Sequence, residues 1–95
     1  MEKKLVDNIE IMPVLPKDGL IAFCNATYRD EIALNGIAIH TNLSRGGFRL
    51  VFPNKHLANG KMVQLFYPLD KEIMGELEDA IFGKYAELLD SIARD

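Results

Sequence analysis

Basic side chains gather in one stretch of an otherwise acidic chain. The segment GGFRLVFPNKHLANGK, from Gly46 to Lys61, contains arginine, lysine and histidine but no acid, whereas the whole chain has 14 Asp and Glu against 11 Lys and Arg. Residues 40–71 hold five basic residues against one acid, a net charge of +4, and residues 72–95 hold two against seven, a net charge of −5. Clustered lysine and arginine neutralise phosphate groups. This uneven charge indicates an anionic partner for the middle of the chain.

The side chains expected to contact this partner are the cations of the basic stretch and its flanks. They are Arg45, Arg49, Lys55, His56, Lys61 and Lys71. Cations that neutralise phosphates, interleaved with aromatic residues that stack on unpaired bases, predict binding of DNA or RNA. A second interpretation stays open, because alternating strands also place Lys and Arg in solvent and aromatic residues in the core without any ligand.

Patterns for catalysis or metal binding are absent from the sequence. Cys24, the only cysteine, lies in the apolar run LIAFCNA, which is typical of a buried thiol rather than a nucleophile. His40 and His56 lie far apart and have no cysteine or acidic cluster at ligand spacing. The run SRGGF is interpreted as a glycine-rich turn, with a phosphate cradle as the alternative. We therefore expect no enzyme activity, no metal, no cofactor and no small-molecule substrate.

The composition predicts one cytoplasmic domain over residues 1–95. A single cysteine cannot form an intrachain disulfide, so an oxidising compartment is not implied. No apolar run approaches the roughly 18 residues of a membrane helix, and no signal-peptide pattern follows the charged start.

Four or five strands are expected before a C-terminal helix. The candidate strands are Val6–Met12, Leu20–Tyr28, Ile32–Thr41, Phe48–Phe52 and Lys61–Tyr67. Pro13 and Pro16 mark PVLP as an edge strand or a connector, and Pro53–Gly60 is expected to be a long connection. The pair Asn35-Gly36 is either a hairpin turn or a bulge in one long strand, and the periodicity leaves both open.

The C-terminal segment has the pattern of an amphipathic helix that ends at about Ala93. Asp70 is placed to cap its N-terminus. Apolar residues recur at three- and four-residue steps at Ile73, Leu77, Ile81, Tyr85, Leu88 and Ile92. Gly75 and Gly83 each cost about 1 kcal/mol relative to alanine inside a helix, so a break near Gly83 stays open.

The order of the elements predicts an α+β fold. Strands followed by one helix indicate an antiparallel sheet of four to five strands with one face covered by the helix. Because a lone helix covers only part of such a sheet, we expect apolar residues such as Ile37, Ile39 and Phe66 to need a partner. A two-fold homodimer joined through strands would supply it.

The segment IALNGIAIHTNLSRGGFRLVFPNKHLANGKMVQLFYPLDKEIMGELEDAIFGKY, from Ile32 to Tyr85, resembles the SpoVG family of bacterial sporulation and septation regulators. The positions at corresponding spacings are Phe48, Val51, Phe52-Pro53-Asn54-Lys55, Gly60, Leu65, Pro68-Leu69 and Ala80-Ile81. The strand Leu20–Tyr28 also fits, so the resemblance covers about residues 20–85. It implies a small α+β domain, a homodimer formed through strands, and DNA or RNA binding in a regulatory role in gene expression, septation, cell division and sporulation. It also favours one continuous strand through Asn35-Gly36.

The sequence departs from the family pattern at the helix. Lys71 remains near the N-cap, but Met74 and Glu76 stand where the family commonly has basic residues, and Gln64 replaces an aspartate. We expect the loop residues to contact nucleic acid, whereas the acidic helix repels phosphate. The alternative function is a protein-interaction module of the same fold in which nucleic-acid binding is weakened or lost.

Overall fold

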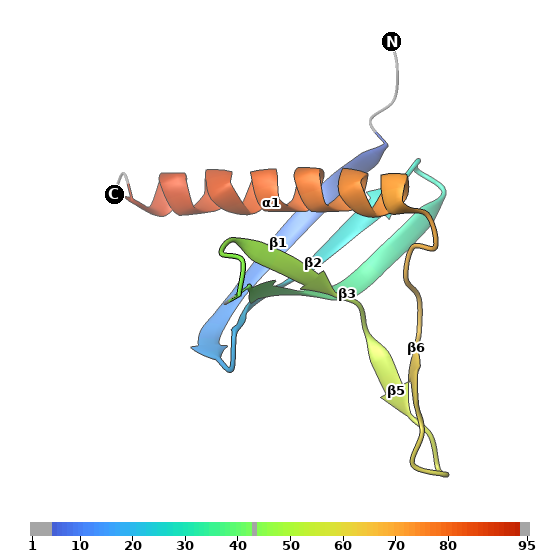
Figure 1. Cartoon of the computed structure of the whole chain (residues 1–95). Helices are drawn as coiled ribbons and strands as arrows, with labels where there is room; N and C mark the ends of the chain where they lie inside the picture. Colours follow the sequence, from blue (N-terminus) through green and yellow to red (C-terminus); the bar gives the residue numbers. More distant parts are fainter. Residues whose placement is uncertain (1–4, 43, 94–95) are drawn as a thin grey trace.

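The computed structural model describes residues 5–42 and 44–93 as six strands followed by one helix. The elements are β1 (Val6–Lys17), β2 (Leu20–Tyr28), β3 (Ile32–Thr41), β4 (Phe48–Val51), β5 (Asn54–His56), β6 (Met62–Gln64) and α1 (Lys71–Ala93). Figure 1 shows α1 crossing one face of the sheet, while β5 and β6 project away from it. The expected α+β fold, with an antiparallel sheet before a C-terminal helix, is confirmed.

Strands β1 to β4 form one antiparallel sheet in chain order, with β1 and β4 at its edges. Pro13 and Pro16 both lie inside β1, which settles PVLP as part of an edge strand. A proline removes one backbone donor, and an edge strand tolerates this because its outer side has no ladder partner.

Strand β3 is continuous through Asn35-Gly36. Cys24 pairs with Ile37 and Asn25 pairs with Asn35, so Gly36 is the extra residue of a bulge. Its φ of 80° lies in the left-handed region, which glycine adopts without a steric penalty. The Gly36 N–H donates to Asn25 Oδ1 at 3.0 Å, which supplies the partner that the ladder lacks there.

Strands β5 and β6 pair with each other in a separate two-stranded sheet. The expected connection at Pro53–Gly60 is wrong, because Asn54–His56 is a strand, and the expected strand Lys61–Tyr67 is reduced to Met62–Gln64. The hairpin Asn54–Gln64, called the arm below, closes around a turn at Gly60, which has a φ of 85°. Every strand residue of the arm is exposed, so no buried face ties it to the main sheet.

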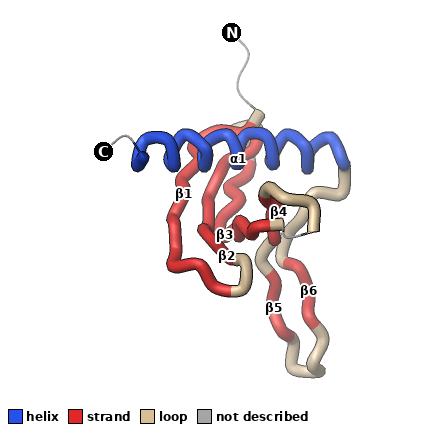
Figure 2. Tube along the Cα trace, turned by 60° about the vertical axis from the view of Figure 1, so that its left-hand side comes forward, coloured by secondary structure: helices blue, strands red, loops and turns tan. Residues whose placement is uncertain are grey.

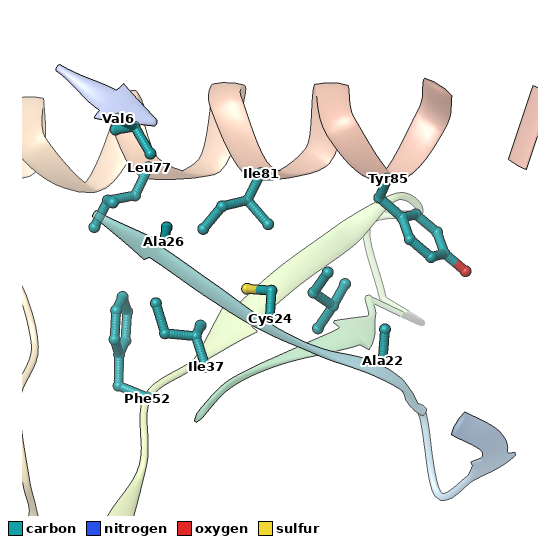
Figure 3. Packing of buried hydrophobic residues seen from close by; sticks show 10 residues of the cluster. Val6, Ala22, Cys24, Ala26, Ile37, Phe52, Leu77, Ile81 and Tyr85 are labelled. Carbon is teal, nitrogen blue, oxygen red and sulfur yellow. The ribbon is translucent and has the colours of Figure 1, made fainter. Parts of the chain in front are cut away.

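The core lies between α1 and the covered face of the sheet. Its buried residues are Val6, Ala22, Cys24, Ala26, Ile37, Ile39, Phe52, Leu77, Ile81 and Tyr85. In Figure 3, Leu77, Ile81 and Tyr85 point from the helix toward the side chains of β2 and β3. Ile37 and Ile39 are fully buried, so the expectation that they need a second chain is wrong. One helix is enough because β2 contributes small side chains beneath it, Ala22, Cys24 and Ala26.

Helix α1 runs unbroken for 23 residues, so the proposed break near Gly83 does not occur. Asp70 caps it as expected, since the Glu72 N–H donates to Asp70 Oδ1 at 2.8 Å. Burial of Leu77 and Ile81 on the sheet offsets the cost of the glycines. The last turns extend beyond the sheet, which leaves Ile92 58% exposed (Figure 1).

Gly83→Ala is expected to stabilise the protein by about 1 kcal/mol. An added Cβ at Gly83 meets nothing within 4 Å, so the change only improves helix propensity. Gly36→Ala is the matched control: its Cβ also meets nothing within 4 Å, but the left-handed φ makes it destabilising by about 1–2 kcal/mol. Urea unfolding of the three proteins measures both changes. A destabilised Gly83→Ala variant would show that this glycine contributes something other than helix backbone.

Candidate nucleic-acid interface

The arm brings three of the expected cations together. Lys55 is opposite Val63 and His56 is opposite Met62 in the ladder, and the Leu57 N–H donates to the Lys61 carbonyl at 2.7 Å. The turn is closed further by the Lys61 N–H, which donates to Asn59 Oδ1 at 3.0 Å. Lys55, His56 and Lys61 are all exposed. Three basic side chains therefore lie within one short, protruding hairpin (Figure 1).

Arg49 and Arg45 belong to β4 and to the turn before it. Arg49 is exposed and is opposite His40 in the ladder, while its neighbour Phe48 contacts α1 through the rings of Phe82 and Tyr85. Because side chains alternate along a strand, Arg49 lies on the sheet face away from the helix. Arg45 lies in the turn before β4, Arg49 lies on β4, and the chain continues from β4 into the arm.

The run SRGGF forms a turn, as interpreted from the sequence. Gly46 and Gly47 have φ values of 76° and 75°, and the Gly46 N–H donates to the Asn42 carbonyl at 2.8 Å. The Arg45 N–H donates to Asn42 Oδ1 at 3.3 Å. At least two of the amides that a phosphate would need are thus engaged within the turn itself.

Lys71 is placed apart from the arm. It is the first residue of α1, between Asp70 and Glu72, and Figure 2 shows that end of the helix separated from the tip of the arm. Its own neighbours are therefore acidic. The structure gathers Lys55, His56 and Lys61 on the arm, places Arg45 and Arg49 before and on β4, and does not bring Lys71 to the arm.

Two acidic residues of α1, Glu76 and Asp79, lie in different surroundings. Glu76 accepts a hydrogen bond from the Tyr28 hydroxyl at 3.2 Å, and Asp79 is exposed. The pKa of Tyr28 is raised, mainly by desolvation of the hydroxyl and next by this hydrogen bond to Glu76.

Within residues 5–42 and 44–93, no three His, Cys, Asp or Glu side chains gather as ligands of a metal ion. In the same ranges, no helix is long and apolar enough to cross a membrane.

The two remaining candidates for chemistry are core and sheet residues. Cys24 is fully buried in the core, as its apolar surroundings in the sequence predicted. His40 is half-buried on β3, and its Nδ1 is buried without a hydrogen-bond partner among the described residues.

Cys24 is expected to react with a thiol reagent at pH 8 only after the protein unfolds. Burial raises the pKa of Cys24 from 9.0 to about 11, so the folded thiol stays protonated where an unfolded one ionises. The contribution to stability is complete below pH 9 and falls as the pH rises from 9 to about 11, by at most about 1.4 kcal/mol per pH unit.

Reaction with Ellman's reagent, with and without 6 M guanidinium, measures the accessibility. Urea unfolding at pH 8 and pH 10.5 measures the pH dependence, with Cys24→Ala as the control that removes the thiol term. Rapid modification of the native protein would contradict the placement of Cys24 in the core.

The fold and the site together define a small α+β domain with an exposed basic hairpin. No protein-family model matches this chain, and a search of the curated proteins also finds no match. The resemblance to the SpoVG family thus rests on the sequence positions given above. The cations could be named from the sequence, but the hairpin that carries three of them was predicted as a long connection, although Asn59-Gly60 is a strong hairpin signal.

Proposed function

We propose that this protein is a small dimeric bacterial regulator that binds DNA or RNA through the arm and β4. This is the role implied by its resemblance to the SpoVG family, whose members act in septation and sporulation. We place its action in the cytoplasm. The observation that carries the proposal is the exposure of Lys55, His56 and Lys61 on one protruding hairpin.

A two-stranded ribbon has suitable dimensions for a nucleic-acid groove. The major groove of B-DNA, about 12 Å wide, admits a pair of β-strands, whose axes lie about 4.8 Å apart. Within residues 5–42 and 44–93, none of the six candidate cations forms an ion pair that would compete with phosphate. Charge attraction of this kind gives affinity with little sequence preference.

The helix does not support the same role. Lys71 lies between two acids, and residues 72–95 after it hold half of the acidic residues of the chain, with a net charge of −5. A phosphate backbone near α1 would be repelled, so the contact is assigned to the arm and β4.

The dimer is proposed to form through the β4 side of the sheet. β4 is an edge strand without proline, whereas the other edge, β1, contains Pro13 and Pro16. A two-fold axis there would present two arms to one nucleic acid and double the number of basic contacts. Sedimentation at micromolar concentration tests this: a mass of 10.7 kDa, that of one chain, would contradict it.

A salt titration tests the binding itself. Fluorescence anisotropy of labelled random duplex DNA, single-stranded DNA and single-stranded RNA should give affinities that fall steeply between about 50 and 200 mM salt. Absence of binding to all three at about 50 mM salt would refute the proposal.

A protein-interaction module is the second candidate, and the apolar side chains of the arm favour it. Met62 and Val63 are exposed, and Leu65 beside them is 60% exposed. Outside the arm, an apolar pocket of about 390 Å³ lies between the β2–β3 end of the sheet, the connection after the arm and the first turns of α1. Lys55→Glu separates the two candidates. It should weaken nucleic-acid binding under the first, by about tenfold at 50 mM salt, and leave co-purifying protein partners in place under the second.

A further inference from the structure

The sheet has one face that α1 does not cover. Ala22 and Cys24 on β2 point toward the helix in Figure 3, so Phe23 between them points to the opposite face. Phe23 lies on an inner strand of the sheet and is still 38% exposed. An aromatic side chain in the middle of an open sheet face is available to a ligand that lies flat on it.

An apolar row crosses this face on all four strands. Met12 pairs with Phe23, Phe23 with Ala38, and Ala38 with Val51. Residues opposite each other in an antiparallel ladder share a face, so the four side chains form one line across the sheet. Met12 is 41% exposed, whereas Ala38 is nearly covered. Phe23 thus stands beside a small residue that leaves its ring accessible.

Polar and basic groups lie on either side of this row. On one side of the row, Arg49 of β4 is opposite His40 of β3 in the ladder. On the other side, Asn25 is opposite Asn35 on β3 and Glu10 on β1. Along β4 the chain passes from Arg49 through Val51, a member of the row, and then enters the arm, so basic residues lie along the chain both before and after the row.

We propose that this sheet face binds unpaired nucleic acid, with one base stacked on Phe23 and the phosphate backbone held by Arg49. The inference rests on the proposed nucleic-acid function and assigns to it a single-stranded ligand. Exposed aromatic residues on the open face of a four-stranded antiparallel sheet stack on unpaired bases in RNA-binding domains. Phe23 and Arg49 are two strands apart and offset by two residues along the strands, about 12 Å between backbones, so a base and a nearby phosphate of one nucleic-acid strand reach both.

Charge and size favour a nucleic acid over a second copy of the chain. A stable protein interface buries about 800 Å² on each partner, whereas this row has only two exposed apolar side chains, Met12 and Phe23. Arg49 attracts phosphate, while Glu10 and Asp7 on β1 repel it, so the backbone crosses from the β4 side and bases extend over β2.

Phe23→Ala is the first test. It is expected to weaken binding of oligo(U) and oligo(dT) about tenfold and to leave duplex DNA binding unchanged, because only unpaired bases stack. The two oligonucleotides distinguish RNA from DNA as the preferred ligand. Leu15→Ala is the matched control, because Leu15 is an exposed apolar residue of β1 outside the row. Equal affinity of Phe23→Ala and the native protein would overturn the inference, and so would a change of oligomeric state in Phe23→Ala, which would assign the face to an interface between copies.

Phe23→Trp provides a readout that does not depend on a loss of function. The chain has no tryptophan, so the new fluorophore reports on this position alone. Oligo(U) or oligo(dT) should quench its emission, and duplex DNA should not. Unchanged emission at saturating oligonucleotide would refute stacking on this face. If the native protein binds nucleic acid and Lys55→Glu weakens it, but neither Phe23 variant responds, then this inference fails while the proposed function stands.

Discussion

Ile81→Ala is expected to lower the free energy of unfolding by about 3 kcal/mol. Ile81 is fully buried in the middle of α1, and Figure 3 places it above the core between Leu77 and Tyr85. Truncation removes the buried methyl groups and leaves a cavity that the sheet below fills only in part. For a domain of this size the total stability is about 5–15 kcal/mol, and 3 kcal/mol lowers Tm by roughly 12–24 °C. Urea unfolding and a thermal melt followed by circular dichroism measure the change.

Ile92→Ala on the same helix is the matched control. It removes the same atoms from a side chain that is 58% exposed, where α1 extends beyond the sheet. Its expected effect is within about 0.5 kcal/mol. Similar losses in both variants would indicate that the end of α1 is buried against another chain, because a free helix end cannot account for them.

The elements with a buried face could be predicted from the sequence. Ile32–Thr41 was expected as a strand, and Leu77, Ile81 and Tyr85 as a helix face, because burial selects apolar residues at the repeat of each element. The choice between hairpin and bulge at Gly36 could not be made from local signals, since Asn-Gly fits both. Pairing with β2 decides it, and pairing is a tertiary property.

The arm could not be recognised by the same reasoning. Both faces of the arm are exposed, so burial does not select apolar residues at alternate positions of its strands. Lys55 and Val63, for example, are opposite each other on the same face. The candidate contact residues could therefore be named from the sequence, but their gathering on one hairpin could not be predicted. The continuity of α1 could not be predicted from the sequence either, because packing against the sheet outweighs the low helix propensity of Gly83.

Reversing two charges on the arm is expected to have the largest effect on binding. In the double variant Lys55→Glu and Lys61→Glu, two phosphate contacts are lost. Each contact contributes about 0.9 to the slope of log K against log salt on duplex DNA, so the slope should fall by about 2. At 50 mM salt this corresponds to a loss of affinity on the order of 10². Anisotropy titrations at four salt concentrations give both quantities.

The control keeps the net charge change and moves it away from the arm. Lys17→Glu with Lys84→Glu alters the charge of the chain by the same amount, on β1 and on α1. The ion pair lost between Lys84 and Glu87, 3.8 Å apart and exposed, contributes little to stability. If contact with the arm determines binding, this variant keeps the native slope and loses affinity only through the long-range field. If both double variants weaken binding equally, only the total charge matters, and the arm has no specific role in holding phosphate.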